Sequence, residues 1–454
     1  MNDVDVIVVG AGGGGLAAAL AAHDAGASVA VLEKLDRPGG NTGLSTGSIP
    51  GAGTRWQKDA GIDDDPGRFA DDLLRQSGPH EAEELTRLLA RVSAPVVEWL
   101  VDRHGVELLL ITDYKHVGHS VPRLHAPAAR KGQVLVDDLV RACGDAGIEI
   151  VLNNPVASLI VEGGAVRGVR VDGDRIGSYD LRADAVVLAA NGYAANPELV
   201  RAWAPDIAGA TYFGGHGSTG EAIEWGIALG ARTGNLGAYQ GYAAVAYPHG
   251  SIVSWTTVEM GGVMLDRDGR RLGDETLGYS GFAETVLRGT EPPAYVVFDT
   301  RIRDYVAAHE EEFRDLLEAG GVREFATADA LAEWIGAPAG NVRSTLDDYQ
   351  SSVAAGRDAF GRSAFGMAPL TPPYVACRST PGLFHTQGGL AVDGDTRPTR
   401  EDGSVVPGLY AVGGVAAGIS GRSGGRGYSS GSGLLAAVGL GYLAGTAAGA
   451  AAAG

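Results

Sequence analysis

An apolar run near the start of the chain, residues 6–9, leads directly into closely spaced glycines at positions 10, 12 and 15. An alanine-rich stretch follows, and a second apolar run, residues 29–32, ends in Glu33. Glycines at this spacing permit a tight turn, close approach of the backbone to a pyrophosphate and close packing of the following helix. The order of strand, turn, helix, strand and acid therefore predicts a βαβ unit that binds FAD or NAD.

The acid after the second strand narrows the choice of dinucleotide. Glu33 stands 21 positions after Gly12, where its carboxylate can accept both hydroxyls of a ribose and disfavours the 2′-phosphate of NADP. The pyrophosphate would lie at the N-terminus of the helix, where free N–H groups and the helix dipole favour negative charge. The alternative is a glycine-rich turn in an ordinary α/β unit that binds nothing.

Length and charge restrict the class of protein. A chain of 454 residues exceeds the usual size of one compact core, so we expect two structural units. The formal net charge of −19 argues against a nucleic acid or an anionic membrane as partner, because both require a basic face. The two cysteines, Cys143 and Cys377, form neither a disulfide framework nor a metal motif. We expect a cytoplasmic protein without a signal peptide, a metal or a nucleic-acid partner.

The apolar stretch 433–454 is long enough to raise the question of a membrane span. It consists largely of alanine and glycine, which drive membrane insertion weakly, and it follows a glycine-rich loop directly. We therefore expect a closing helix that packs within the dinucleotide-binding unit, and no membrane span.

The middle of the chain divides into regions of different pattern. Residues 71–104 and 134–146 have helical periodicity, and 183–190 read as a buried strand. Alternation over 165–171 followed by a turn suggests a hairpin or meander. The region from about 234 to 383 is aromatic-rich and interrupted by paired prolines. It has the character of an insertion.

Several short blocks match one protein family in order. They are Glu33-Lys34, Gly39-Gly40-Asn41-Thr42, residues 194–199, residues 262–275, Thr386-Gln387-Gly388-Gly389 and residues 406–411. Through these blocks the chain resembles the fumarate reductase and 3-ketosteroid dehydrogenase flavoproteins over nearly its whole length. The resemblance implies an α/β fold in which an α+β capping domain, 234–383, interrupts a Rossmann-like FAD-binding domain formed by 1–233 and 384–454. The substrate would lie between the cap and the flavin.

The resemblance also implies where FAD would be held. No histidine follows the Gly39-Gly40-Asn41-Thr42 block, so we expect the FAD to be bound non-covalently. The flavin O2 would face backbone N–H groups at the start of the last helix. The implied cofactor residues are Gly10, Gly12, Gly13, Gly14, Gly15, Glu33, Lys34, Gly39, Gly40, Asn41, Thr42, Ser45, Thr46, Gly47, Val156, Ala190, Asn191, Gly192, His385, Thr386, Gly413, Gly414, Ser432, Leu434 and Leu435.

Departures from the family pattern concern both the cofactor and the substrate. Gly414 stands where the family usually has a Glu that holds the ribityl chain. Tyr279 and Tyr428 occupy the positions of the arginines that donate a proton and grip carboxylates in the fumarate reductases. Phe384 and Tyr242 replace two histidines of those enzymes. Burying a dicarboxylate among these rings would leave its charges unpaired, at a cost on the order of several kcal/mol or more. A neutral, apolar substrate with one or two oxygens is expected.

The run Gly427-Tyr428-Ser429-Ser430-Gly431 most resembles the 3-ketosteroid 4-dehydrogenase type, whose motif is Gly-Tyr-x-Ser-Gly. By that resemblance, the Tyr428 hydroxyl and the Gly431 N–H would bind the carbonyl oxygen as it gains enolate charge. Tyr279, assisted by Ser430, would take the α-proton, and the β-hydrogen would leave as hydride to flavin N5. Tyr242 is a further catalytic candidate. The alternative for each tyrosine is a residue of the cavity wall whose hydroxyl is already hydrogen-bonded.

Three functions remain open at this stage. The leading one is an FAD-dependent dehydrogenase that introduces a C=C bond beside a ketone of a steroid-like or cyclic substrate. The second is a flavin-dependent ene-reductase that uses the same site in reverse, and the third is a flavin-binding electron carrier without substrate turnover. No haem-binding CxxCH motif occurs, so a separate electron acceptor or donor is expected as partner.

Overall fold

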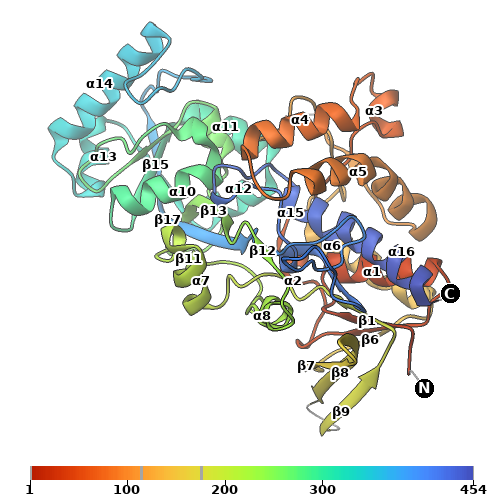
Figure 1. Cartoon of the computed structure of the whole chain (residues 1–454). Coiled ribbons are helices and arrows are strands. Elements are labelled where there is room, and N and C mark those ends of the chain that lie inside the picture. The colour runs from red at the N-terminus through yellow and green to blue at the C-terminus, as the bar shows by residue number, and fades with distance from the viewer. Residues whose placement is uncertain (1–2, 113–115, 174–176, 453–454) are drawn as a thin grey trace.

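The computed structural model describes residues 3–112, 116–173 and 177–452, and one lobe is organised around a five-stranded parallel sheet (Figure 1). The strand order is β19-β10-β1-β2-β6. The strands are β1 (Val6–Val9), β2 (Val29–Leu32), β6 (Glu149–Val151), β10 (Ala185–Leu188) and β19 (Leu409–Ala411). β1 and β10 are buried along their whole length, as expected for strands covered on both faces. The predicted α/β fold class is confirmed.

The glycine turn after β1 places α1 (Gly13–Asp24) directly against the sheet. Gly10 has φ +108°, a conformation that L side chains rarely adopt. A Cβ on Gly15 would lie 1.9 Å from the Gly10 carbonyl oxygen. The turn and the helix therefore pack backbone to backbone, which only glycine at these two positions allows.

The C-terminal helix packs along α1 (Figure 1). It begins with α15 (Ser432–Leu434), continues through a π-helical turn, η4 (Leu435–Gly439), and ends in α16 (Leu440–Ala452). Among the residues described, Ser432–Ala452 is the one helix long and apolar enough to cross a membrane, but 61% of its most apolar window is buried inside the protein. The expected packing within the dinucleotide-binding lobe is observed.

Small residues explain how closely the two helices approach. Cβ atoms on Gly441 and Gly445 would lie 2.3 Å from the Gly14 oxygen and 2.1 Å from the Ala18 oxygen. Because the glycines recur every four residues, they form one stripe along the helix. The alanine and glycine composition of this segment therefore serves interhelical contact.

Further helices and two small sheets complete this lobe. Asp65 caps α4 by accepting hydrogen bonds from the Gly67 and Arg68 backbone N–H groups at 2.7 and 3.1 Å, with Pro66 at the first helical position. The predicted meander is observed as an antiparallel sheet, β7-β8-β9. The elements are α3 (Arg55–Asp59), α4 (Pro66–Ser77), α5 (Glu83–His104), α6 (Gly132–Asp145), β3 (Ile49–Pro50), β4 (Leu109–Leu110), β5 (Leu124–Ala126), β7 (Val156–Glu162), β8 (Ala165–Gly173) and β9 (Gly177–Arg182).

The second lobe is built on a mostly antiparallel sheet of order β14-β15-β17-β13-β20, with β11 and β16 also pairing with β17. Its long central strand, β17 (Tyr374–Thr386), continues past the predicted boundary at 383/384 and stays paired with β13 as far as Thr386. The predicted domain limits stay predictions. The remaining strands are β11 (Thr211–Tyr212), β13 (Gly237–Ala246), β14 (Val263–Leu265), β15 (Ala294–Asp299), β16 (Val322–Phe325) and β20 (Ser423–Gly424).

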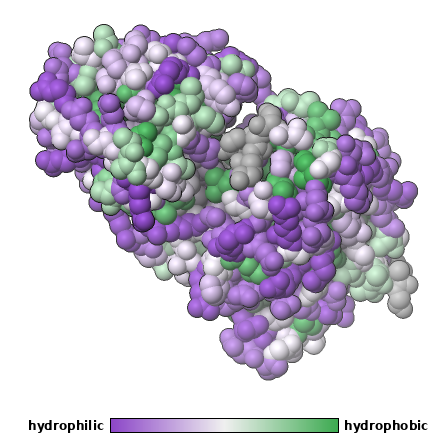
Figure 2. Space-filling model, turned by 90° about the horizontal axis from the view of Figure 1, so that it is seen from above, coloured by the Kyte–Doolittle hydropathy of each residue, from purple (hydrophilic) through white to green (hydrophobic). Residues whose placement is uncertain are grey.

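Helices surround this sheet and the junction between the lobes. The larger ones in the second lobe are α10 (Gly278–Gly289), α11 (Thr300–His309), α12 (Glu311–Glu318), α13 (Ala328–Ile335) and α14 (Ala339–Ala355). The shorter elements are α2 (Gly40–Leu44), α7 (Pro197–Trp203), α8 (Glu221–Ala228), α9 (Thr256–Glu259), β12 (Thr233–Gly234), β18 (Gly389–Leu390) and the 3-10 turns η1 (Pro205–Ile207), η2 (Glu275–Leu277) and η3 (Gly413–Val415). Figure 2 shows that hydrophilic residues dominate the face seen from above, and that apolar residues gather near the junction of the lobes.

Buried charges fix the loop that precedes α10. The Glu275 carboxylate, fully buried, accepts hydrogen bonds from Arg271 at 2.7 Å and from Arg362 at 3.1 Å. Arg271 also pairs with Asp358 at 2.6 Å. Removing one partner of such a cluster leaves a buried charge uncompensated. The cluster therefore holds the first turn of α10, which carries Tyr279, in one position.

The helix contact predicts the effect of adding one methyl group. Gly445→Ala would place a Cβ against the Ala18 carbonyl, so the free energy of unfolding should fall by about 1–3 kcal/mol. Gly144→Ala is the matched control, because a Cβ at this exposed position in α6 meets nothing within 4 Å. Thermal unfolding of both variants checks this, and equal midpoints would contradict the close contact.

Candidate active site

A single continuous cavity of about 1170 Å³ runs from the glycine turn after β1 to a group of aromatic residues in the second lobe. Its walls include the turn residues Gly10 and Gly12 at one end and Tyr242, Tyr279 and Tyr428 at the other. A site of this form can hold a long ligand at the first end and a second, smaller molecule among the aromatic rings.

The glycine end has the features that a dinucleotide requires. The N-terminus of α1 has no side-chain cap and no acidic residue in its first turn, and Gly12, Gly13 and Gly14 line the cavity there. The Gly13 N–H donates to the Thr42 hydroxyl at 3.1 Å. A helix N-terminus lined by glycine fits a pyrophosphate, because the glycines put no side chain of their own between an anion and the helix dipole.

Glu33 lies at the end of β2 and lines the same cavity. Its carboxylate accepts one hydrogen bond from the Ala11 N–H at 2.8 Å and another from the Leu35 N–H at 2.9 Å. Each carboxylate oxygen has two acceptor positions. The backbone therefore orients the group and leaves capacity for the two hydroxyls of a ribose, as the sequence predicts.

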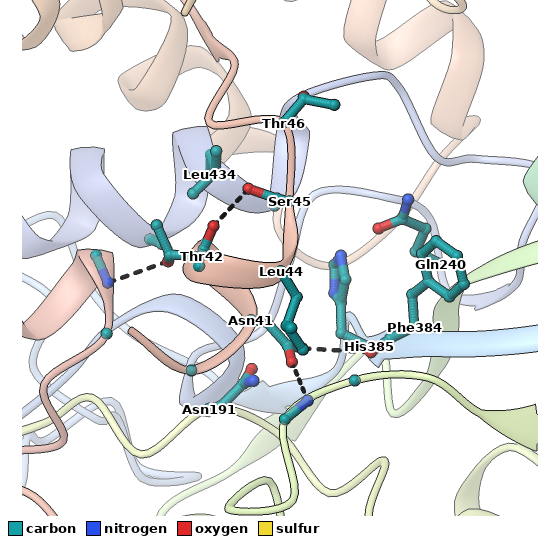
Figure 3. A pocket seen from close by; sticks show the side chains of 18 of the residues that line it. Asn41, Thr42, Leu44, Ser45, Thr46, Asn191, Gln240, Phe384, His385 and Leu434 are labelled. Atoms are coloured by element: carbon teal, nitrogen blue, oxygen red, sulfur yellow. Dashed lines mark hydrogen bonds between the residues drawn. The ribbon is translucent and has the colours of Figure 1, made fainter. Parts of the chain in front are cut away.

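The α2 segment connects the glycine end to the second lobe (Figure 3). The Asn41 side chain accepts a hydrogen bond from the Gly215 N–H at 2.5 Å and donates to the Phe384 carbonyl at 3.3 Å. The Ser45 hydroxyl donates to the Thr42 carbonyl at 2.7 Å. These bonds hold the loop beside His385 and Leu434, where a flavin ring would lie by the resemblance.

Most of the predicted cofactor residues lie in the wall of this cavity. They are Gly10, Gly12, Gly13, Gly14, Glu33, Lys34, Gly40, Asn41, Thr42, Ser45, Thr46, Val156, Ala190, Asn191, His385, Thr386, Gly413, Gly414 and Leu434. The structure does not place Gly15, Gly39, Gly47, Gly192, Ser432 and Leu435 in the wall. Of these six, Gly192 packs against the wall residue Thr386, because a Cβ on Gly192 would lie 2.1 Å from the Thr386 hydroxyl.

The resemblance implies a Glu at position 414, and a local contact explains why this chain has Gly414 there. A Cβ on Gly414 would lie 2.4 Å from the Asn191 amide oxygen and 2.6 Å from the Gly192 nitrogen. A glutamate would therefore displace the 191–192 turn. In this chain Asn191, with φ +65°, occupies the space beside Gly414.

Aromatic rings form the other end of the cavity. The Tyr242 ring stacks on Phe384 with centroids 5.4 Å apart and on Tyr279 at 5.1 Å. The Tyr242 hydroxyl donates to the Val253 carbonyl at 3.1 Å and accepts from the Trp255 N–H at 3.1 Å. Because backbone groups already occupy this hydroxyl, Tyr242 contributes a ring to the wall, and the structure does not bring its hydroxyl to the other candidate catalytic groups.

The other predicted catalytic side chains come together across the two lobes. The Tyr279 hydroxyl, on α10, lies 3.1 Å from the Ser430 hydroxyl, which precedes the last helix. The Tyr428 ring packs edge-on against Tyr279 at 6.1 Å. Gly431 has φ +79° and is the N-cap residue of α15. This brings one hydroxyl pair, a second phenol and a backbone N–H to one end of the cavity.

Burial and hydrogen bonds act in opposite directions on the two tyrosines. Burial raises the pKa of Tyr279 to about 12, and its hydrogen bond with Ser430 lowers the pKa in part. Burial also raises the pKa of Tyr428 well above its usual value, while hydrogen bonds with the Gly433 and Gly431 backbone and the Ser432 side chain lower it. Both phenols are therefore protonated at neutral pH, and both have donors placed to stabilise negative charge on the oxygen.

His385 is oriented by its neighbours instead of being free to titrate near neutrality. Burial lowers its pKa to about 4, so the ring is neutral. Its Nδ1 lies 3.1 Å from the Gln387 amide nitrogen and 3.3 Å from the Thr386 carbonyl. These contacts fix the orientation of the ring beside residues 386 and 387.

Arg422 and Arg426, in the loop that precedes Tyr428, lie outside the cavity wall. Arg422 pairs with Glu81 at 2.8 Å, and the Arg426 carbonyl accepts from the Gln76 amide at 2.7 Å. Within residues 3–112, 116–173 and 177–452, no three His, Cys, Asp or Glu side chains group as metal ligands. Cys143 and Cys377 are buried and unpaired with each other.

Sequence reasoning missed several wall residues. Glu221 lines the cavity and pairs with the predicted residue Lys34 at 2.8 Å, a contact between distant parts of the chain that no motif indicates. Gln387 lies within the matched block Thr386-Gln387-Gly388-Gly389, so its position could have been predicted. His116 and Val117 also line the aromatic end, but they belong to a loop with no recognisable pattern.

Comparisons with known proteins agree with this geometry. The family model described as "FAD binding domain" matches residues 5–430. The chain is 32% identical over 92% of its length to the NADH:fumarate oxidoreductase of Klebsiella pneumoniae (strain 342), of which it spans 45%. It is 31% identical to "Probable fumarate reductase Ifc3" of Shewanella frigidimarina (strain NCIMB 400), covering 92% of this chain and 70% of that protein.

A solved structure has a similar fold over the full length. The 3-ketosteroid-Δ4-(5α)-dehydrogenase of Rhodococcus jostii RHA1, in complex with 4-androstene-3,17-dione, superposes with a TM-score of 0.77 at 26% identity. The match covers 100% of this chain and 98% of that one. This chain is therefore an FAD-dependent oxidoreductase that belongs to the family of the FAD binding domain, together with fumarate reductases.

Proposed function

We propose that the protein is a dehydrogenase that introduces a C=C bond beside the ketone of a steroid-like or cyclic substrate. The single observation that carries the proposal is the pair formed by the Tyr279 and Ser430 hydroxyls, 3.1 Å apart, beside Tyr428. The 26% identity to a 3-ketosteroid-Δ4-(5α)-dehydrogenase over the whole chain supports it.

The aromatic end of the cavity favours a neutral substrate over a dicarboxylate. Tyr279 and Tyr428 stand at the positions that hold arginines in the fumarate reductases, by the resemblance. The stacked rings of Tyr242 and Phe384 complete this wall. A phenol can donate one hydrogen bond but offers no positive charge, so two carboxylates here would lose hydration without gaining an ion pair.

In the proposed reaction, Tyr428 binds the ketone oxygen and Tyr279 accepts the proton. The Tyr428 hydroxyl and the Gly431 N–H polarise the ketone oxygen and stabilise the enolate charge that develops on it. This makes the neighbouring hydrogen acidic, and Tyr279 takes it as a proton while Ser430 stabilises the phenolate. The β-carbon loses its hydrogen with the bonding electron pair, and the C=C bond forms. When bound, FAD supplies the oxidising capacity, as the acceptor of a hydride.

The FAD in this proposal is bound non-covalently, and the two electrons leave through a separate acceptor. Denaturation should then release the yellow flavin into the supernatant. The reverse reaction, reduction of an activated enone, is the second candidate, because relatives of 31 and 32% identity are named for fumarate reduction.

Anaerobic mixing decides between the two directions. The holoenzyme is mixed with saturated 3-ketosteroids and, in parallel, with saturated cyclic ketones, and the flavin absorbance is followed. Bleaching by one ketone supports the proposal and identifies the substrate class. Absence of bleaching, with rapid reoxidation of the chemically reduced enzyme by an enone, supports the reductase.

Fumarate, a dicarboxylate, tests the assignment of a neutral substrate. The reduced holoenzyme mixed anaerobically with fumarate should stay reduced, because Tyr279 and Tyr428 offer its two carboxylates phenols, which carry no positive charge. The flavin absorbance measures this directly. Reoxidation by fumarate at a rate above that of buffer alone would contradict the assignment of a neutral substrate.

Removing the Tyr428 hydroxyl tests the carbonyl site. Tyr428→Phe should lower kcat about 100-fold or more, because one of the donors to the developing oxyanion is lost, while the FAD content stays unchanged. Tyr247→Phe is the matched control, since Tyr247 is 52% exposed and lies outside the cavity wall. Wild-type turnover by Tyr428→Phe would remove this residue from the mechanism.

The pH profile tests Tyr279 as the base. Only the deprotonated phenol accepts a proton, and its pKa of about 12 lies far above neutrality, so kcat/KM should rise about tenfold per pH unit up to the alkaline limit of stability. Ser430→Ala removes the hydrogen bond that lowers this pKa. Its rate at a fixed pH should therefore fall by about tenfold per unit of upward shift.

Ser429→Ala is the control for that variant, because the Ser429 hydroxyl is buried and has no hydrogen-bond partner among the residues described. Its profile should match the wild type. A profile that is flat between pH 7 and 10 in the wild type would show that the phenolate of Tyr279 is not the base.

A further inference from the structure

A buried ion cluster lies behind the loop that carries Ser430. The Arg123 side chain is fully buried. Its Nε and one terminal nitrogen donate to the Asp64 carboxylate at 2.9 and 2.7 Å. The other terminal nitrogen donates to Asp72 at 2.7 Å, and the guanidinium lies over the Phe69 ring at 4.6 Å. The cluster fixes Arg123 at the base of α4, away from the cavity wall.

Arg123 also determines the protonation of a neighbouring histidine. The nitrogen that contacts Asp72 lies 3.1 Å from His119 Nδ1. A guanidinium can only donate hydrogen bonds, so Nδ1 must be the acceptor and the proton of the neutral ring lies on Nε2. Burial lowers the pKa of His119 to about 4, which keeps the ring neutral over the ordinary pH range.

The Nε2 proton of His119 is directed at the loop that carries Ser430. His119 Nε2 lies 2.8 Å from the Ser430 carbonyl oxygen, so the imidazole donates to it. The Ser430 N–H donates in turn to the Val117 carbonyl at 3.0 Å. One short segment, 117–119, therefore binds both backbone polar groups of the residue whose side chain meets Tyr279.

The contact between the two segments is close. Gly118 has φ +84°, and a Cβ there would lie 2.3 Å from the Ser429 hydroxyl. No side chain separates the segments at this point. A displacement of 117–119 would therefore displace 429–431 with it.

We propose that His119 is a positioning residue for the reaction. Its hydrogen bond to the Ser430 carbonyl holds the Ser430 hydroxyl at Tyr279 and aims the Gly431 N–H, and the Asp64–Arg123–Asp72 cluster holds His119 in the one tautomer that can donate. The inference rests on the proposed function for the roles of Ser430 and Gly431. His119 itself does not line the cavity.

Two substitutions separate this role from simple core packing. His119→Gln places an amide N–H near the position of Nε2 and keeps the donor to Ser430. His119→Asn keeps an acceptor near Nδ1 for Arg123 but does not reach the Ser430 carbonyl. A residue that only partners Arg123 would be replaced as well by Asn as by Gln.

The two variants are compared as holoenzymes, with equal FAD content and thermal unfolding as a check on the fold. We expect His119→Gln to stay within about threefold of wild-type kcat. His119→Asn should lose kcat by about 30-fold or more with little change in KM, because a small misplacement of reacting groups costs rate more than binding. Equal kcat for the two variants would overturn the proposal.

A measurement without turnover distinguishes failure of this inference from failure of the proposed function. If no ketone or enone reacts with the wild-type enzyme, the proposed function fails, and the hydrogen bond is tested on holoenzyme labelled with 15N-histidine. The His119 ring, assigned by its loss in His119→Gln, should give the 15N shifts of a neutral ring protonated at Nε2 from pH 6 to 8. A ring protonated at Nδ1, or one that titrates in this interval, would overturn the assignment.

Discussion

Direct backbone contact at glycine is the constraint on which the cofactor end of the structure depends. Gly15 meets the Gly10 carbonyl in the first turn, and Gly441 and Gly445 meet the backbone of α1 from the other side. With no side chain between them, the strand, α1 and α16 form one tightly packed layer. The N-terminus of α1 and the first turn of the C-terminal helix therefore line the same cavity.

At the aromatic end of the cavity, each of the two lobes supplies one of the two hydrogen-bonded hydroxyl groups. Tyr279 comes from α10, whose first turn is held by the buried Glu275 cluster. Ser430 comes from the loop before the last helix, where segment 117–119 holds its backbone. Buried ionic groups thus stand behind both partners of one 3.1 Å hydrogen bond. We interpret these clusters as a source of positional precision more than of stability, because burying charges costs desolvation energy.

The sequence predicted different parts of the molecule to different degrees. Periodicity located the main helices and the buried strands, because the core imposes a regular spacing on apolar residues. Resemblance to a family brought Tyr279, Tyr428 and Ser430 to one site. Neither approach found Arg123 or His119, because these polar residues follow no periodicity and their partners come from separate segments of the chain. Tyr242 was grouped with the catalytic candidates, but its hydroxyl is bonded to the Val253 carbonyl.

By itself the sequence determined the dinucleotide site, since the glycine spacing and Glu33 are local features whose geometry follows from the backbone alone. Through the resemblance it also predicted that tyrosines stand where the fumarate reductases have carboxylate-binding arginines. Only the tertiary structure decided which hydroxyls lie within hydrogen-bond distance and which histidine supports the loop that carries Ser430. It also decided that there is no room for a side chain at position 414 beside Asn191. These are contacts between residues far apart in the chain, and their distances depend on how whole elements pack.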